Sequence, residues 1–168
     1  AILIKIEDNG PIFYSQYRTG LFGQKFKIIK LRSMKENAEK NGPVWAKKVD
    51  PRITFIGKFI RKTRIDELPQ LWLVLTGEMS IIGPRPERPE IDLILIKEIP
   101  NYKLKYSLKP GLTGWAQVNC EYGASIADSA RKFSYEIFYI KNQSIWLDLL
   151  ICIKTLKLIS NMEGSVPR

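Results

Sequence analysis

The sequence contains no histidine and only two cysteines. The lack of histidine removes the commonest general base and excludes Ser-His-Asp catalysis and most zinc sites. Cys120 and Cys152 stand alone in the sequence, so neither a disulfide framework nor a paired-cysteine metal site is supported. We expect both to be small core residues of a protein in a reducing compartment.

Long apolar runs and acidic residues are also scarce. The longest stretch without a charged residue, Pro110 to Cys120, has eleven residues, whereas a membrane-spanning helix needs about 20. The chain as given is therefore not expected to cross a bilayer. Lys and Arg number 27 against 17 Asp and Glu, which leaves a net charge of +10. This surplus favours an anionic partner: nucleic acid, an anionic membrane surface or phosphorylated small molecules.

The rest of the composition is that of an ordinary globular protein, with 45% apolar and 26% charged residues over 168 positions. We expect one domain, residues 1–168, that is α+β, rich in helix and associated with a membrane. Its β part is predicted to be a small antiparallel hairpin, because Pro11–Gln16 and Lys25–Leu31 are rich in Ile, Phe and Tyr and are joined by a turn at residues 20–23.

Helices are predicted from apolar periodicity and from residues typical of helix ends. Asp50-Pro51 resembles a helix start, with Asp as cap and Pro in the first turn, and a second helix is expected to run from near Asp66 to a stop at Thr76-Gly77. The other predicted elements are a short polar helix at Met34–Lys40, a buried strand at Met79–Ile82, helices at residues 87–99, 126–141 and 146–160, and a turn-rich loop at residues 110–114.

Asp66 and Glu67 are adjacent carboxylates at the start of an apolar helix. As an N-cap, Asp66 would accept backbone N–H bonds that keep it ionised, and Pro69 would remove an N–H that lacks a helical partner anyway. The plain interpretation is a cap followed by a first-turn acid. The other is catalytic, because an ionised Asp66 can attack phosphorus while Glu67 holds Mg²⁺, a metal that takes one or two carboxylates plus substrate phosphates.

Two further segments carry cations suited to phosphate. In Gly83-Pro84-Arg85-Pro86, two prolines fix φ on either side of Arg85 and reduce the entropy that it loses on clamping a phosphate, and Arg88 follows. In the predicted strand, Lys30 and Arg32 would point to the same face, which suits a diphosphate. A solvated connector or sheet face remains the alternative for each segment.

Basic and apolar residues are interleaved in Phe55–Arg64 and, with a period of two, in Tyr102–Lys109. Such segments suit a membrane interface, where Tyr, Trp and Lys present an apolar body with a polar tip. Amphipathic packing on the domain's own core accounts for the same pattern.

Taken in order, these blocks resemble the bacterial sugar transferases, the monotopic polyprenyl-phosphate phosphoglycosyl transferases that prime cell-surface glycan synthesis. The resemblance covers essentially the whole chain, and several blocks in register make it strongly specific. The matching segments are Gly10-Pro11 with Phe13–Gln16 and Arg18, Phe26–Met34 (FKIIKLRSM), Arg52–Thr54 with Gly57 and Arg61, Asp66–Leu71 (DELPQL), Met79–Pro86 (MSIIGPRP), Lys109–Asn119 (KPGLTGWAQVN) and Tyr139–Leu149 (YIKNQSIWLDL).

The resemblance implies a two-step reaction. Asp66 would attack the sugar-bearing phosphate of a nucleotide diphosphate sugar, most naturally a UDP-sugar, and release UMP; the covalent phosphosugar would then pass to polyprenyl (undecaprenyl) phosphate. Glu67 is implied to hold Mg²⁺. The residues implied to bind substrate phosphates are Arg85 with Pro84 and Pro86, together with Lys30, Arg32, Arg64 and Arg88.

The resemblance also implies a location at the cytoplasmic face of a bacterial inner membrane, and it leaves a homo-oligomer open. The family usually carries an embedded apolar helix before the hairpin, where this chain has only the apolar hexamer Ala1–Ile6. That hexamer is either an ordinary strand or the stub of a longer segment, so we expect an N-terminally truncated piece. The chain departs from the family pattern at Arg64-Ile65, at Asn119-Cys120 and at Glu136, where Asp is more usual.

Two other functions fit the basic composition. One is a peripheral membrane module without catalysis, which would use its amphipathic segments to sit on anionic lipid. The other is a nucleic-acid-binding domain, but the sequence has no recognisable motif of that kind, so no nucleic acid partner is expected.

Overall fold

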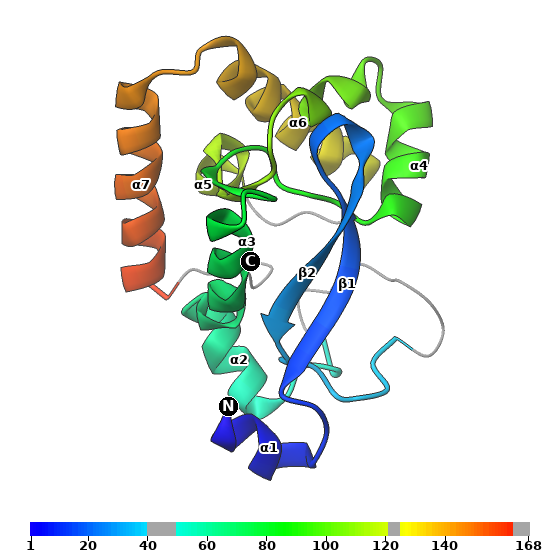
Figure 1. Cartoon of the computed structure of the whole chain (residues 1–168), viewed down its shortest axis with the longest axis vertical. Coiled ribbons are helices and arrows are strands. Elements are labelled where there is room, and N and C mark those ends of the chain that lie inside the picture. Colours follow the sequence, from blue (N-terminus) through cyan, green and yellow to red (C-terminus); the bar gives the residue numbers. More distant parts are fainter. Residues whose placement is uncertain (40–49, 121–124, 163–168) are drawn as a thin grey trace.

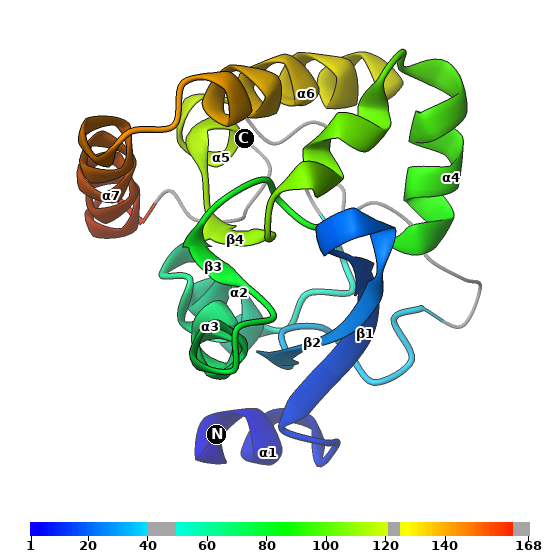
Figure 2. The ribbon, with the colours of Figure 1, turned by 45° about the horizontal axis from the view of Figure 1, so that its top comes forward.

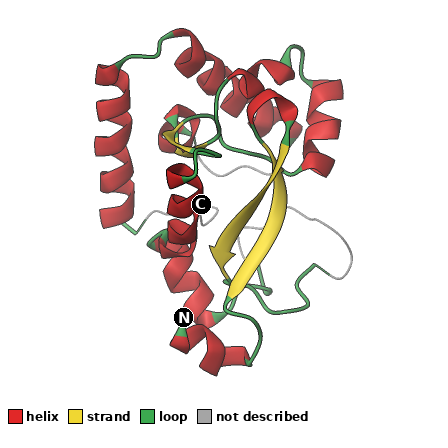
Figure 3. Cartoon of the chain, viewed as in Figure 1, coloured by secondary structure: helices red, strands yellow, loops and turns green. Residues whose placement is uncertain are grey.

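The computed structural model describes residues 1–39, 50–120 and 125–162. The expected helix-rich α+β class with a small antiparallel sheet is confirmed (Figures 1 and 3). The helices are α1 (Ile2–Asp8), α2 (Phe55–Lys62), α3 (Leu71–Leu75), α4 (Pro89–Glu98), α5 (Trp115–Asn119), α6 (Ile126–Lys141) and α7 (Ile145–Ser160); the strands are β1 (Phe13–Thr19), β2 (Lys25–Leu31), β3 (Ser80–Ile82) and β4 (Gly111–Thr113); and 3₁₀ helices cover Leu21–Gly23, Ile65–Gln70 and Tyr102–Ser107.

The predicted hairpin is confirmed as β1 and β2. They pair antiparallel along their whole length, with Phe13 opposite Leu31 and Thr19 opposite Lys25, so β1 begins at Phe13 rather than at Pro11. Figure 1 shows this hairpin lying beside the column formed by α2 and α3, with α1 at one end. Because β2 packs against the 3₁₀ helix Ile65–Gln70, the hairpin places a strand end next to the acidic dyad.

A second, parallel β pair was not predicted. Ser80 of β3 lies opposite Gly111 of β4, within the segment that the sequence indicated as a loop. A Cβ on Gly111 would lie 2.1 Å from the backbone nitrogen of Gly83, so this close approach requires glycine. The Gly111 N–H donates to the Pro84 carbonyl at 2.9 Å, and the pair thereby holds the start of the arginine loop (Figure 2).

Several helix predictions are confirmed. The helices expected at residues 126–141, 146–160 and 87–99 are α6, α7 and α4. The strand expected at Met79–Ile82 is β3, but it is not buried as predicted, since Ile81 is 52% exposed. The helix expected from Asp66 is divided into the 3₁₀ helix and α3, and it ends as predicted at Thr76 and Gly77, where Gly77 has φ 83°.

Two helix starts were wrong. Asp50 does not cap a helix: its carboxylate accepts the Arg52 N–H and pairs with the Arg52 guanidinium, which forms a local turn. α2 begins later, with Thr54 as N-cap, whose hydroxyl accepts the Gly57 N–H at 2.9 Å. The polar helix expected from Met34 is also absent from the described residues up to Glu39, because Met34 forms an antiparallel bridge with Ile53; the rest of that prediction lies outside the described residues.

The alternation in Tyr102–Lys109 does not form a strand. Residues Tyr102–Ser107 form a 3₁₀ helix, because Tyr102 and Tyr106 turn inward together and pack edge to face, with Phe133 of α6 against Tyr102. Leu95 and Ile99 complete this buried cluster. A second cluster, Ile28, Leu73 and Met79, joins β2 to α3 and β3.

Two expectations about apolar and thiol residues are also settled. The hexamer Ala1–Ile6 is not a strand, since it lies in the turn that opens α1 and in α1 itself. Cys120 and Cys152 are unpaired thiols, as predicted, but both are half-buried rather than core residues. Within the described part of the chain, each helix is too short or too polar to span a bilayer.

Candidate active site

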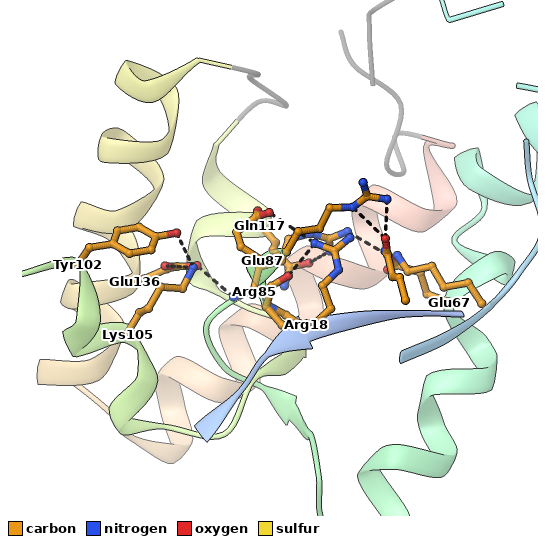
Figure 4. Close-up of polar contacts among 12 residues, drawn as sticks. Arg18, Glu67, Arg85, Glu87, Tyr102, Lys105, Gln117 and Glu136 are labelled. Atoms are coloured by element: carbon orange, nitrogen blue, oxygen red, sulfur yellow. Dashed lines mark hydrogen bonds and ion pairs between the residues drawn. The ribbon is translucent and has the colours of Figure 1, made fainter. Parts of the chain in front are cut away.

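The acidic dyad and its cationic partners meet from three separate segments. Lys30 comes from β2, Asp66 and Glu67 from the 3₁₀ helix Ile65–Gln70, and Arg85 from the loop after β3. Figure 4 shows the Glu67 side chain facing the arginine side of this assembly. The sequence could indicate these residues only one segment at a time, and the fold brings them within contact distance.

Glu67 is the anion that three cations share. Its Oε1 lies 2.7 Å from Lys30 Nζ and 3.1 Å from Arg85 Nη2, and its Oε2 lies 3.5 Å from Arg64 Nη1. Burial by itself raises the pKa of Glu67, but the charges of Lys30, Arg85 and Arg64 outweigh it and hold that pKa well below its usual value. Glu67 is therefore ionised at neutral pH, and the cluster of Glu67 with its three cations carries a net positive charge.

Asp66 is buried beside this cluster and is poorly satisfied. Its side chain is 4% exposed, and its Oδ1 has no hydrogen-bond partner in the described part of the chain. Burial raises the pKa of Asp66 from 3.8 to about 6; the charge of Lys30 opposes this and that of Glu67 adds to it. At pH 7 most of the population is a desolvated carboxylate, a state that favours attack on an electrophile.

The expectation that Asp66 is an N-cap held ionised by backbone N–H bonds is thus wrong. Arg64 occupies the cap position of the 3₁₀ helix, in the left-handed conformation with φ 56°. This turn starts the helix before Asp66 and places Asp66 inside it, so the carboxylate turns into the protein rather than onto the helix end. Its environment raises the pKa instead of lowering it.

Arg85 is fixed through both its side chain and its main chain. Besides Glu67, its guanidinium donates through Nη1 to Gln117 Oε1 of α5 at 2.9 Å. Its backbone N–H donates to Glu136 Oε1 of α6 at 3.0 Å. Figure 4 shows Arg85 between Gln117 and Glu67, with Glu136 on the other side. The predicted stiff arginine loop therefore holds its guanidinium toward the dyad.

A small pocket, partly open to solvent, lies at this meeting point, and its empty space together with the adjoining solvent is about 240 Å³. Its lining includes Lys30, Glu67, Arg85 and Pro86 from the predicted set, and Arg18 from β1. The residues that complete the lining are Ile28, Gln70, Gly111 and Leu112. A pocket with three cations and one carboxylate suits an anionic ligand.

Arg32 and Arg88 lie apart from this pocket. Arg32 follows the end of β2, where its guanidinium pairs with Asp8 and its Nε donates to the Pro11 carbonyl. Arg88 donates through Nε to Gln16 of β1 at 2.9 Å and pairs with Glu39. Both guanidiniums are committed to contacts that hold the hairpin. Pro84 contributes its carbonyl to β4 rather than to the pocket lining.

Three groups at the site were not predicted from local sequence patterns: Arg18, Gln117 and Glu136. Arg18 donates to the Pro86 carbonyl at 3.1 Å and pairs with Glu87. All three lie in or near the segments that carried the family resemblance, and that was the one signal in the sequence that pointed to them. Their spacing from Asp66 follows no local period.

Metal binding at this site has a restricted donor set. Among residues 1–39, 50–120 and 125–162 there is no cluster of three or more His, Cys, Asp or Glu side chains. Glu67 is the carboxylate that lines the pocket, whereas its neighbour Asp66 is buried beside it and is not part of the lining. This set fits Mg²⁺, which takes one or two carboxylates and completes its shell with water and phosphate.

Comparison with known proteins identifies the family. A model of the family described as "Bacterial sugar transferase" matches residues 1–162. The UDP-N-acetylgalactosamine-undecaprenyl-phosphate N-acetylgalactosaminephosphotransferase of Aeromonas hydrophila is 46% identical over 165 residues, which are 98% of this chain and 39% of that protein. The chain belongs to the bacterial sugar transferase family.

Two UDP-glucose:undecaprenyl-phosphate glucose-1-phosphate transferases are similar as well. The protein of Caulobacter vibrioides is 40% identical over 159 residues, covering 92% of this chain and 59% of that protein. The protein of Escherichia coli K12 is 38% identical over 157 residues, covering 92% of this chain and 34% of that protein. The chain thus spans less than two thirds of each of these relatives.

Proposed function

We propose that this domain transfers a phosphosugar from a UDP-sugar to polyprenyl phosphate through a covalent intermediate on Asp66. The observation that carries the proposal is a buried carboxylate whose Oδ1 has no hydrogen-bond partner among the described residues. It lies beside a cluster in which Lys30, Arg64 and Arg85 surround Glu67. The names of the relatives, which are undecaprenyl-phosphate sugar phosphotransferases, support the same reaction class.

In the first step, an Asp66 oxygen attacks the sugar-bearing phosphorus. An O–P bond forms to the carboxylate, the phosphoanhydride bond breaks, and UMP leaves with the bonding electron pair. Nucleophile and donor are both anions, so their repulsion must be offset before they meet, and the guanidinium of Arg85 and the ammonium of Lys30 provide that charge in the pocket.

In the second step, a phosphate oxygen of the lipid acceptor attacks the same phosphorus. The bond between Asp66 and phosphorus breaks, the carboxylate is regenerated, and the product is a polyprenyl diphosphate-sugar. We propose that Glu67 holds Mg²⁺ together with substrate phosphates, where the metal would neutralise charge on the transferred group. Arg85 would shift part of its contact from Glu67 to the donor phosphates when they bind.

The lipid acceptor requires access to a membrane, and we propose that the domain lies on the cytoplasmic face of the bacterial inner membrane. Large apolar side chains are exposed along α1, α2 and α3, which follow one another in one column (Figure 1). An exposed apolar surface of this kind on a basic protein suits the interface of an anionic bilayer. The exposed residues are Ile2, Leu3, Ile6, Phe55, Phe59, Leu71, Trp72 and Leu75.

UMP release with and without the lipid acceptor tests the proposed function. With Mg²⁺ and UDP-N-acetylgalactosamine or UDP-glucose alone, we expect a burst of about one UMP per protein, as a ping-pong enzyme gives. Vesicles that contain undecaprenyl phosphate should convert the burst into steady turnover. Vesicle binding without UMP release would support the non-catalytic membrane module instead.

A further inference from the structure

Arg85 lies between two prolines, and this leaves its loop with a single main-chain hydrogen-bond donor. Pro84 and Pro86 have no N–H, so within Pro84-Arg85-Pro86 the Arg85 N–H is the sole backbone donor. That donor is taken by Glu136 Oε1 at 3.0 Å. Glu136 lies on α6 and does not line the pocket, so it acts on the loop and not on a ligand.

Glu136 belongs to a buried ionic cluster. Its Oε2 lies 3.3 Å from Lys105 Nζ, and the two side chains are 5% and 4% exposed. Lys105 Nζ also donates to the Tyr102 hydroxyl at 3.0 Å (Figure 4). Burial raises the pKa of Glu136, and the charge of Lys105 opposes that rise. Burial by itself would lower the pKa of Lys105, but the nearby acidic groups, Glu136 above all, keep it above its usual value.

Stability alone does not explain such a pair. Buried ion pairs are often replaced by apolar residues of similar size with no loss of stability. Here the carboxylate faces two ways: one oxygen accepts from Lys105, and the other accepts the one N–H of the arginine loop. The guanidinium of that same arginine lies 3.1 Å from Glu67 and borders the pocket.

We propose that Glu136, with Lys105 as its counter-ion, is a positioning residue that aims Arg85 into the pocket. The Glu136 oxygen that accepts the Arg85 N–H fixes the direction of the loop. Lys105 provides the positive charge that stabilises the Glu136 carboxylate in its buried position. This inference rests on the proposed function, because it assigns the loop to donor binding. It adds two residues, on α6 and on the 3₁₀ helix Tyr102–Ser107, that contact no substrate.

Two double variants separate positioning from packing. Lys105→Met with Glu136→Gln removes the ion pair but keeps an acceptor for the Arg85 N–H. Lys105→Met with Glu136→Met removes the acceptor as well, with side chains of similar volume. The readouts are thermal unfolding, and the half-saturating UDP-sugar concentration and maximal rate of adduct formation on the protein.

The Gln variant is expected to stay within about threefold of the wild-type half-saturating concentration, whereas the Met variant should need about 10- to 100-fold more UDP-sugar, the loss expected when a clamping group is misplaced. Equal half-saturating concentrations in both folded variants would overturn the proposal and leave the pair a packing feature.

If either variant fails to fold, hydrogen exchange of the Arg85 amide in the wild type decides: protection is expected, and rapid exchange contradicts the contact. A wild type that forms no adduct would overturn the proposed function, while the amide measurement still tests the contact.

Discussion

Asp66→Asn is expected to abolish UMP release and, at the same time, to stabilise the folded chain at neutral pH. An amide cannot form the acyl phosphate, so activity should fall at least about 10³-fold. The near-isosteric side chain keeps the shape of the site. The two measurements are UMP release under single-turnover conditions and urea unfolding of both proteins.

The gain in stability follows from the pKa of Asp66. That pKa is about 6 in the folded chain and 3.8 in the unfolded chain, so the folded state binds the proton more tightly. The free energy of unfolding therefore falls as pH rises from 3.8 through 6. This difference in proton affinity corresponds to a loss of about 3 kcal/mol in unfolding free energy above pH 6, and Asn avoids the loss. The advantage of Asp66→Asn should vanish at about pH 4. In the wild type, by contrast, the rate of adduct formation should rise through pH 6 because the nucleophile must be ionised.

Asp92→Asn is the matched control. Asp92 of α4 is also buried and burial raises its pKa, but it lies outside the acidic dyad and the cations paired with Glu67. Its replacement should likewise gain stability at neutral pH, yet leave UMP release within about threefold of wild type. Undiminished turnover in Asp66→Asn would remove Asp66 from the chemistry, and equal losses in both variants would indicate a general effect of altering buried carboxyls.

The second large effect is expected at Glu67. Glu67→Gln removes the shared anion of Lys30, Arg64 and Arg85, which leaves three cations close together without their counter-charge. We expect a loss of about 3 kcal/mol or more in unfolding free energy, as for other buried pairs broken on one side. Turnover should fall at least about 100-fold, because the cations would no longer be held around the pocket.

The pH dependence of this loss has the opposite sign to that of Asp66. The pKa of Glu67 lies well below its unfolded value of 4.5, so its stabilising contribution is complete above pH 4.5 and disappears only as pH falls through the folded pKa. Asp8→Asn is the control, since it breaks the ion pair of Arg32 away from the pocket. It should lower stability while UMP release persists. A fully active Glu67→Gln would contradict the role assigned to the cluster.

Local sequence patterns predicted the elements whose contacts are local. The hairpin, α6 and α7 follow from alternating and helical periodicity, because each buries one face of a regular element. The alternation at Tyr102–Lys109 predicted no particular element, and in the structure the tyrosines of this 3₁₀ helix pack on Phe133 of a helix that comes later in the chain. Tertiary contacts decided the conformation of that segment.

The parallel pairing of β3 with β4 was out of reach for a similar reason. Each strand has three residues, too few to show a period, and paired residues such as Ser80 and Gly111 are 31 positions apart in the sequence. The close approach of Gly83 to Gly111 is visible only in the fold. The glycines and proline of residues 110–114 predicted a loop, and three residues of that loop form strand β4.

At the candidate site, the sequence indicated the charged groups but not their pKa values or their ion-pair partners. Asp66 and Glu67 are neighbours in sequence, yet burial raises one pKa to about 6 while three cations lower the other. Lys30 and Arg32 were predicted as a pair, yet Lys30 meets Glu67 and Arg32 meets Asp8. These outcomes depend on which segment packs against each side chain, and a single sequence does not contain that information.

The central claim is that Asp66 carries the phosphosugar. Its most direct measurement is mass spectrometry of the chain after incubation with Mg²⁺ and a UDP-sugar without acceptor, first intact and then as fragments. We expect one added phosphosugar, located on Asp66 and lost when undecaprenyl phosphate is supplied. A phosphosugar located on another residue, or turnover with undecaprenyl phosphate and no covalent species at any time, would contradict it.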